Sequence, residues 1–245
     1  MRSIRPNSPS SETSVRVGFV IFFLFAMESF RKVHNYLTNL RKSKAISTIQ
    51  PLPIRQLLFL GLITLLGMGG LGLVLLPYTS EVTWQILFEK SSNNLYSSLA
   101  VGGGIGLGAS LISLYISRSF PTSDLERKLR QRLPLHAMSS LTIVFLSLCA
   151  GIGEELLFRG PLLFGLFEYI SLPAGILLNA IFFVGLHGYL NPRQDLPWAL
   201  RLWLVAFSSV LGLVTISLSI TCAMTAHTIY DLVLLHAMRR DSLSA

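Results

Sequence analysis

The chain has 245 residues, of which 51% are hydrophobic and only 13% are charged. A soluble domain carries about 25% charged residues, so this composition excludes an ordinary soluble enzyme and favours a polytopic α-helical membrane protein. The net charge of +8 does not indicate nucleic-acid binding. Its basic residues lie between hydrophobic runs, where cytoplasmic loops collect Lys and Arg.

Residues 1–56 form a basic N-terminal segment that contains one short hydrophobic stretch. Residues 1–16 are polar, and we expect them to be disordered. Residues 17–27 are apolar but fall short of the roughly 17–25 residues that a spanning helix needs. The sequence leaves open whether this stretch is a signal-like segment, a tilted first helix extended by its flanks, or an interfacial anchor.

A second segment, residues 57–134, contains two glycine-rich hydrophobic helices, predicted at 57–76 and 95–116, and then a basic loop. The second helix carries the pairs Gly102/Gly106 and Gly104/Gly108, a spacing that lets helix backbones approach closely. A phosphate-binding glycine loop is excluded, because no Lys-Ser/Thr follows and the glycines lie at membrane depth.

The third segment, residues 135–240, contains the remaining hydrophobic runs. Further helices are predicted at 138–158, 161–170, 172–189, 198–220 and 221–238. Pro161 is expected to start a new short helix, and the last two helices to form a tight hairpin. The fold predicted for the chain is therefore all-α, a transmembrane bundle of about six to eight helices with a polar intramembrane cavity.

The distribution of basic residues predicts the orientation of the bundle. Lys and Arg concentrate in 31–56, in 118–134 and in the C-terminal tail, whereas Glu81 and Glu89 lie in the loop between the two glycine-rich helices. The positive-inside rule places the basic loops in the cytoplasm. We expect an integral, multi-pass protein of the plasma (inner) membrane.

Three charged residues interrupt the apolar run 138–158 and its extension: Glu154, Glu155 and Arg159. Each charge at the centre of a membrane helix costs about 2.5–3.5 kcal/mol, so such residues usually face a protein interior and have a function. Glu155 and Arg159 are four residues apart and can pair on one helix face. Glu154 is rotated by about 100° from Glu155 and is left for chemistry. The structural alternative is a buried ion pair that only joins helices.

Two later helices carry histidine in i, i+4 pairs with another notable side chain. Phe183 precedes His187, and His227 precedes Asp231. Two histidines, an aspartate and Glu154 on three separate membrane helices can meet only in the interior of the bundle. Their convergence favours a functional site over isolated packing residues.

These residues resemble the three motifs of a known family. The sequences Glu154-Glu155-Leu-Leu-Phe-Arg159, Phe183-Val-Gly-Leu-His187 and His227-Thr-Ile-Tyr-Asp231 are similar to EExxxR, FxxxH and HxxxN/D of the CPBP family. That family comprises type II CAAX prenyl endopeptidases and bacteriocin-processing or abortive-infection-like membrane proteins. The resemblance covers about residues 138–238. Each motif alone is weak, but three in order within apolar helices form a strong signal.

The resemblance implies an intramembrane endopeptidase that hydrolyses a membrane-associated protein or peptide, with CAAX-type processing. By this analogy Glu154, helped by His187, activates water, and His227 with Asp231 stabilises the tetrahedral oxyanion. Structural roles are implied for the other motif residues: Glu155, Arg159 and Phe183. Many relatives have Asn where this chain has Asp231. Because an ionised aspartate only accepts hydrogen bonds, we expect Asp231 to be protonated or, preferably, to orient His227.

Other functions are compatible with the same residues. No cofactor is required by the glutamate mechanism, but zinc bound by Glu154, His187 and His227 is an alternative. A non-proteolytic membrane scaffold or immunity-type protein is a second alternative, and a proton-coupled transporter is less favoured because no internal repeat is visible. The expected partners are the lipid bilayer and the membrane-associated substrate, with no nucleic acid. Substrate prenylation and oligomeric state do not follow from the sequence.

Overall fold

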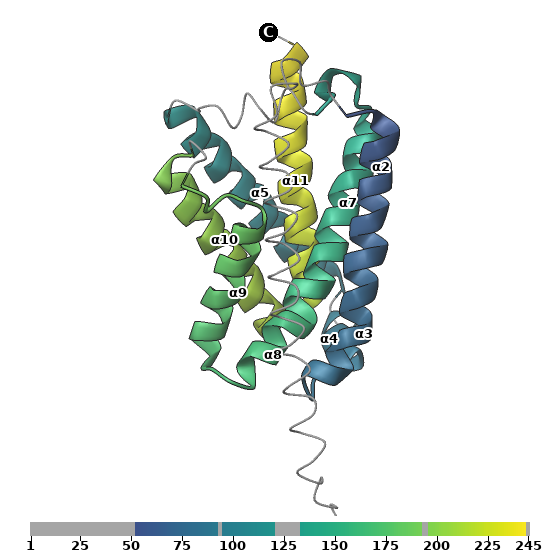
Figure 1. Cartoon of the computed structure of the whole chain (residues 1–245), viewed down its shortest axis with the longest axis vertical. Helices are drawn as coiled ribbons and strands as arrows, with labels where there is room; N and C mark the ends of the chain where they lie inside the picture. The colour runs from purple at the N-terminus through teal and green to yellow at the C-terminus, as the bar shows by residue number, and fades with distance from the viewer. Residues whose placement is uncertain (1–51, 93–94, 121–132, 193–195, 244–245) are drawn as a thin grey trace, which may run out of the picture. The chain divides into compact units, whose positions relative to one another are not determined.

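The computed structural model describes residues 52–92, 95–120, 133–192 and 196–243 (Figure 1). These residues form helices and connecting turns without any strand, which confirms the all-α fold predicted from the sequence. The hydrophobic stretch 17–27 and the polar segment before it lie outside the described residues.

In chain order the helices are α2 (Ile54–Ile63), η1 (Thr64–Gly69), α3 (Gly70–Thr79), α4 (Trp84–Ser92), α5 (Leu95–Ser119), η2 (Leu135–Ala137), α7 (Ser140–Leu157), η3 (Phe158–Leu162), α8 (Leu163–Phe167), α9 (Leu172–Leu186), α10 (Trp198–Ser217) and α11 (Ile220–Leu243). The predicted hairpin of the last two helices is confirmed, because α10 and α11 are separated only by residues 218–219.

Four helical stretches in the described part of the chain are long and apolar enough to cross a membrane. They are Ile54–Thr79, Leu95–Ser119, Ser140–Phe167 and Trp198–Ser217. Helix α9 is apolar but only 15 residues long, which is less than the ~20 residues of an ordinary spanning helix. These stretches make the chain an integral, multi-pass membrane protein.

Helix α11 differs from the sequence expectation. The predicted run 221–238 is helical within α11, but α11 is not among the candidate spans of the described chain. Figure 1 shows α11 in the middle of the bundle, and it contacts α5, α7 and α10. Its buried positions include Ala223, Ala226 and His227. Since neighbouring helices cover it, α11 can carry polar residues that lipid would exclude.

The glycines of α5 divide into two faces. A side chain on Gly102 or Gly106 would collide with the α11 backbone at Cys222 or Ala226. Close backbone approach at this predicted pair is therefore confirmed. At Gly104 and Gly108 an added Cβ meets nothing within 4 Å among the described residues, so the same approach is not found there. Within the described chain, only the Gly102/Gly106 pair faces a helix, since α11 lies along one side of α5.

The predicted break before Pro161 is present. A kink at Gly160 interrupts the helical backbone within η3, and Pro161 follows it directly as the next helical segment leads into α8. Gly160 has a non-helical backbone (φ −88°, ψ −111°) at this bend. The ring of Trp84 fills the space beside it, since an added Cβ on Gly160 would lie 2.7 Å from that ring.

Trp84 also joins this bend to α3. Its indole Nε1–H donates a hydrogen bond to the Leu73 carbonyl at 2.8 Å. Pro77 lies four residues after Leu73 inside α3 and has no N–H to offer that carbonyl. Trp84 therefore satisfies a backbone group that the proline leaves without its helical partner.

The two ends of the bundle differ in charge. Helices α2, α7 and α10 begin at one end, where α5 and α11 finish (Figure 1). That end carries Arg55, Arg118, Arg201, Arg239 and Arg240. The opposite end carries Glu81 and Glu168. The described ends of the predicted basic loops, at Arg55 and Arg118, thus share one side of the bundle, and the assignment of this side to the cytoplasm stays a prediction from the positive-inside rule.

Candidate active site

The two adjacent glutamates of α7 have different surroundings. The Glu155 side chain is fully buried, whereas the Glu154 side chain keeps 13% of its surface exposed. Gly151, one turn earlier, lets α7 approach α11 so closely that a Cβ there would collide with Thr228. This close approach brings both glutamates next to the polar residues of α11.

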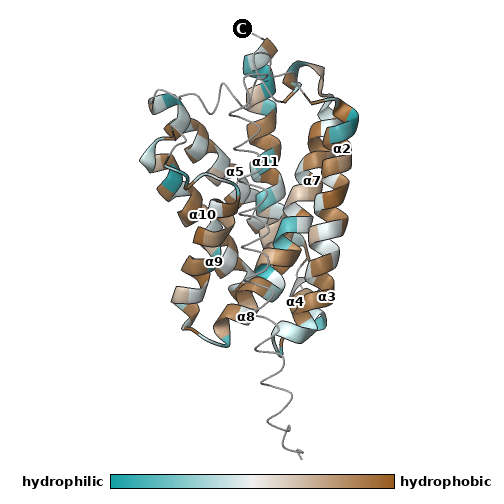
Figure 2. Cartoon of the chain, in the orientation of Figure 1, coloured by the Kyte–Doolittle hydropathy of each residue, from teal (hydrophilic) through white to brown (hydrophobic). Residues whose placement is uncertain are grey.

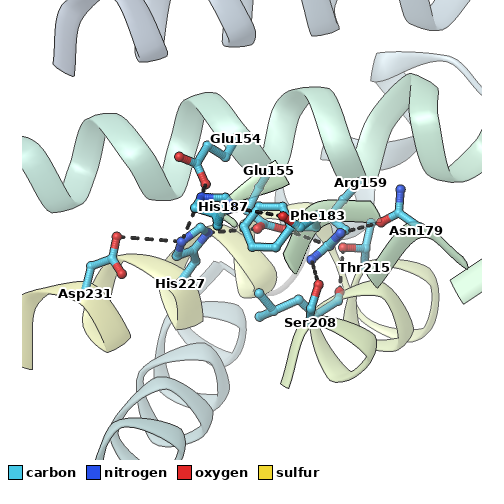
Figure 3. A network of polar contacts seen from close by, with 11 residues as sticks. Glu154, Glu155, Arg159, Asn179, Phe183, His187, Ser208, Thr215, His227 and Asp231 are labelled. Atoms are coloured by element: carbon cyan, nitrogen blue, oxygen red, sulfur yellow. Dashed lines mark hydrogen bonds and ion pairs between the residues drawn. The ribbon is translucent and has the colours of Figure 1, made fainter. Parts of the chain in front are cut away.

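The candidate residues from the three motifs converge, as Figure 3 shows. Glu154 Oε2 lies 3.4 Å from His187 Nε2 and 3.9 Å from His227 Nε2. Asp231 Oδ2 lies 3.6 Å from the same His227 nitrogen. The expectation that these four side chains meet inside the bundle is confirmed, and their catalytic roles stay predictions.

His187 is held at the end of α9 by its own helix. Its Nδ1 lies 2.8 Å from the Phe183 carbonyl oxygen. Because a carbonyl only accepts hydrogen bonds, Nδ1 is the donor and Nε2 is the nitrogen presented to Glu154. The Phe183 ring packs against both imidazoles, with centroids 4.5 Å from His187 and 5.7 Å from His227. Phe183 therefore spaces the two histidines apart.

His227 contacts two carboxylates through its two ring nitrogens. Its Nδ1 lies 2.9 Å from Glu155 Oε1, and Asp231 lies on the side of Nε2 at 3.6 Å. The sequence analysis assigned Glu155 only to Arg159 and expected Asp231 to orient His227, a role that stays a prediction. The structure adds Glu155, because the α7–α11 contact brings it against an imidazole to which no sequence spacing relates it.

Arg159 is the centre of a buried polar network. Its Nε lies 3.1 Å from Glu155 Oε2, which confirms the predicted pair. The guanidinium also donates to Asn179 Oδ1 of α9 and, at 2.9 Å, to Ser208 Oγ of α10. It lies over the Phe183 ring, 5.2 Å from the centroid. The network joins the α7–η3 stretch to α9 and α10 through one charge (Figure 3).

Sequence reasoning missed two members of this network. Asn179 and Ser208 lie outside the three motifs, and both side chains are buried. Asn179 also donates to the Phe158 carbonyl at 3.0 Å. The signal that could have found Asn179 is its polarity within the apolar helix α9. Ser208 offers no comparable signal, because serine back-bonds to its own helix in many membrane segments.

A cavity of about 340 Å³ opens from these residues. Its polar lining consists of Glu154, His187, Tyr189, Ser208, His227, Tyr230 and Asp231. Its apolar lining includes Leu133, Leu204, Leu234, Leu235 and Met238. Along α11 the lining runs from His227 to Met238, a distance of about 16 Å at 1.5 Å per residue. The cavity therefore connects the polar cluster to the basic end of the bundle.

The zinc alternative would use Glu154, His187 and His227. Within the described ranges, no group of three or more His, Cys, Asp or Glu side chains is placed as a metal site. The Nδ1 atoms of His187 and His227 are engaged with Phe183 and Glu155, while their Nε2 atoms face Glu154. Histidine ligands of metals are held in the same way through their second nitrogen, so zinc at these residues stays an alternative.

The fold and the site define a membrane protein of packed helices with a carboxylate–imidazole cluster inside the bundle. Residues 136–233 match the family described as type II CAAX prenyl endopeptidase Rce1-like. This region carries all three motifs, so the CPBP resemblance is confirmed, and the family is one of membrane proteases. No curated protein and no solved structure matches the chain significantly.

Proposed function

We propose that this chain is an intramembrane endopeptidase in which Glu154 activates a water molecule for attack on a peptide carbonyl. The observation that carries this proposal is the position of Glu154 Oε2. This oxygen is buried and accepts no hydrogen bond from the described residues, yet it faces the Nε2 atoms of both histidines at 3.4 and 3.9 Å. Because Glu154 lines the cavity, this unpartnered carboxylate oxygen can accept a hydrogen bond from a water molecule there.

The proposed reaction begins with proton transfer from water to Glu154. His187 presents its unprotonated Nε2 beside Glu154 and accepts a second hydrogen bond from the same water, which orients the water for attack. The new C–O bond converts the carbonyl into a tetrahedral oxyanion. Collapse of this intermediate breaks the C–N bond, and Glu154 returns its proton to the leaving amine.

His227 is the proposed donor to the oxyanion. Its Nδ1 faces the Glu155 carboxylate, so Nε2 carries a hydrogen only when the ring is doubly protonated. Carboxylates of Glu155, Asp231 and Glu154 lie 2.9, 3.6 and 3.9 Å from the ring nitrogens. These negative charges compensate an imidazolium, whose hydrogen bond strengthens as charge develops on the substrate oxygen.

The proposed substrate is a membrane-associated protein or peptide, with CAAX-type processing carried over from the family. The apolar cavity walls support this choice, because a segment that enters from the basic end contacts leucines and Met238 before it reaches Glu154. We further propose residence in the plasma (inner) membrane with the basic end in the cytoplasm, which the positive-inside rule supports.

The first test compares newly formed protein termini in membranes that contain the unaltered chain, Glu154→Gln or Glu168→Gln. Glu154→Gln keeps the shape of the side chain and removes its basicity, so it should abolish the termini. Glu168 is exposed at the opposite end of the bundle, and its substitution should change nothing. If Glu154→Gln retains the biological role and all termini, the scaffold alternative is correct. Thermal stability in detergent checks folding.

The second test addresses metal dependence. We propose that hydrolysis requires no metal ion, because Glu154 and the two histidines supply the base and the donor themselves. Activity of the purified protein should survive dialysis against EDTA and 1,10-phenanthroline. Loss of activity that added zinc restores would favour the metalloendopeptidase alternative.

A further inference from the structure

We propose that Tyr189 is a further catalytic residue, whose hydroxyl donates a second hydrogen bond to the substrate oxyanion. This inference rests on the endopeptidase function proposed above. Tyr189 lies two residues after the FxxxH-like motif and belongs to none of the three motifs. It reaches the site through the way in which α9 ends.

The end of α9 has a backbone geometry that determines where Tyr189 lies. Gly188 has φ 78°, a left-handed conformation that favours glycine. The Gly188 N–H donates to the Gly185 carbonyl at 2.9 Å, and the Tyr189 N–H donates to the Val184 carbonyl at 3.3 Å. These two bonds form a Schellman motif, which ends a helix and folds the following residue back against it.

This fold-back places the Tyr189 ring beside His187. The two rings are nearly parallel, with an interplanar angle of 12° and centroids 5.8 Å apart. Tyr189 lines the same cavity as Glu154, His227 and Asp231. Asp231 and then Glu154 are the charged groups that act electrostatically on its hydroxyl. Tyr189 therefore lines the cavity beside His187, the residue that faces Glu154.

The other hydroxyl groups that line the cavity already have hydrogen-bond partners. Ser208 accepts from Arg159 at 2.9 Å, which holds its oxygen toward the buried guanidinium. The Tyr230 hydroxyl lies 2.9 Å from Ser113 Oγ of α5. The Tyr189 hydroxyl has no hydrogen bond within the described residues. Among the hydroxyls that line the cavity, Tyr189 is thus the one without a partner in the described chain.

The chemistry of the site calls for such a donor. A tetrahedral oxyanion is usually stabilised by more than one hydrogen bond, and His227 Nε2 supplies one. Asp231 is next to that nitrogen, but an ionised carboxylate cannot donate. A phenol donates without giving up its proton, since its ordinary pKa is near 10. The Tyr189 hydroxyl supplies the hydrogen-bond donor that an ionised Asp231 lacks.

The test uses a synthetic peptide that spans a cut found to depend on Glu154. Tyr189→Phe keeps the ring stacked on His187 and removes only the hydroxyl. Because the hydrogen bond forms in the transition state, we expect kcat to fall about 10²–10³-fold with little change in KM. Tyr115→Phe is the matched control, because Tyr115 is 73% exposed on α5, and its kcat should be unchanged.

A double substitution distinguishes donation from general packing. Asp231→Asn introduces an amide, which can donate to the oxyanion. In that background Tyr189→Phe should cost clearly less in kcat than it does in the unaltered chain. If Tyr189 had only a structural role, Tyr189→Phe would lower kcat by the same factor in both backgrounds. It would also lower the thermal stability of the protein in detergent.

Two outcomes overturn the inference in different ways. If no cut depends on Glu154, the proposed function and this inference fail together. The second outcome is that Glu154→Gln is inactive while Tyr189→Phe keeps the kcat of the unaltered chain, or lowers kcat by the same factor with and without Asp231→Asn. In that case only the role of Tyr189 is wrong.

Discussion

The stretch Ile54–Thr79 and helix α11 have similar lengths and opposite characters. The first is the most hydrophobic of the candidate spans in the described chain, with a mean hydropathy of 2.3, and only 22% of its window is buried. Helix α11 carries His227, Asp231 and two arginines and is not a candidate span. Yet α11 is the helix around which α5, α7 and α10 pack.

The difference shows that hydrophobicity marks the side that faces lipid and that polarity marks the interior. In Figure 2 the α2–α3 stretch is mostly brown, whereas α11 carries hydrophilic residues along its length. In a bilayer, apolar side chains gain little by leaving lipid, so small residues and hydrogen bonds hold helices together. Polar side chains are then tolerated only where other helices surround them.

The Ser140–Phe167 stretch combines both characters. Its mean hydropathy is 1.8, and 50% of its window is buried. One face contacts the outer α2–α3 stretch, and the other presents Glu154 and Glu155 to α11. The comparison therefore predicts that substitutions on the inner faces are costly and that matched substitutions on the outer faces are tolerated.

The largest expected effect follows from removing the buried charge. Arg159→Met leaves Glu155 without its guanidinium partner, and breaking such a buried pair costs about 3–5 kcal/mol. Unfolding in mixed micelles with increasing SDS measures the change. Arg55→Met at the exposed start of α2 is the control and should be close to neutral. Equal stabilities of the two variants would contradict the comparison.

A smaller effect is expected from one hydroxyl of the network. Ser208→Ala removes the 2.9 Å hydrogen bond from Arg159, and hydrogen bonds to charged groups contribute about 1.5–3 kcal/mol. The neighbouring Ser209→Ala is the matched control, because the Ser209 hydroxyl donates to Val205 of its own helix. Ser208→Ala should lower SDS resistance and hydrolysis, and Ser209→Ala neither. The opposite ranking would exclude Ser208 from the support of the site.

The smallest expected effect separates the two glycine faces of α5. Gly106→Ala pushes a Cβ into the Ala226 carbonyl of α11, and such overpacking typically costs about 1–3 kcal/mol. Gly104→Ala meets nothing within 4 Å and should raise stability by up to about 1 kcal/mol, because alanine is the better helix former. Thermal unfolding of both variants in one detergent checks the sign of each change. Destabilisation by Gly104→Ala would indicate a partner on its face.

Much of the site was predictable because the motifs lie within single helices. Spacing alone places Glu155 and Arg159 on one helix face, and the cost of intramembrane charge sends Glu154, His187 and His227 to the interior. The match to residues 136–233 confirms the family that these motifs suggested. The catalytic roles of these residues stay predictions, to be tested as described.

The all-α class and the motif residues were determined by the sequence itself, because they depend on composition and on spacing within one helix; the sequence offered two glycine pairs on α5, and the neighbouring helix decided that Gly102/Gly106 makes the contact. Other features were decided only by tertiary structure. These are the bond from Glu155 to His227, the ends of the Arg159 network at Asn179 and Ser208, and the position of Tyr189. Each depends on which helices are neighbours and on the bend at Gly160. Side chains from different helices meet only after the bundle has packed, and no spacing along the chain encodes that meeting.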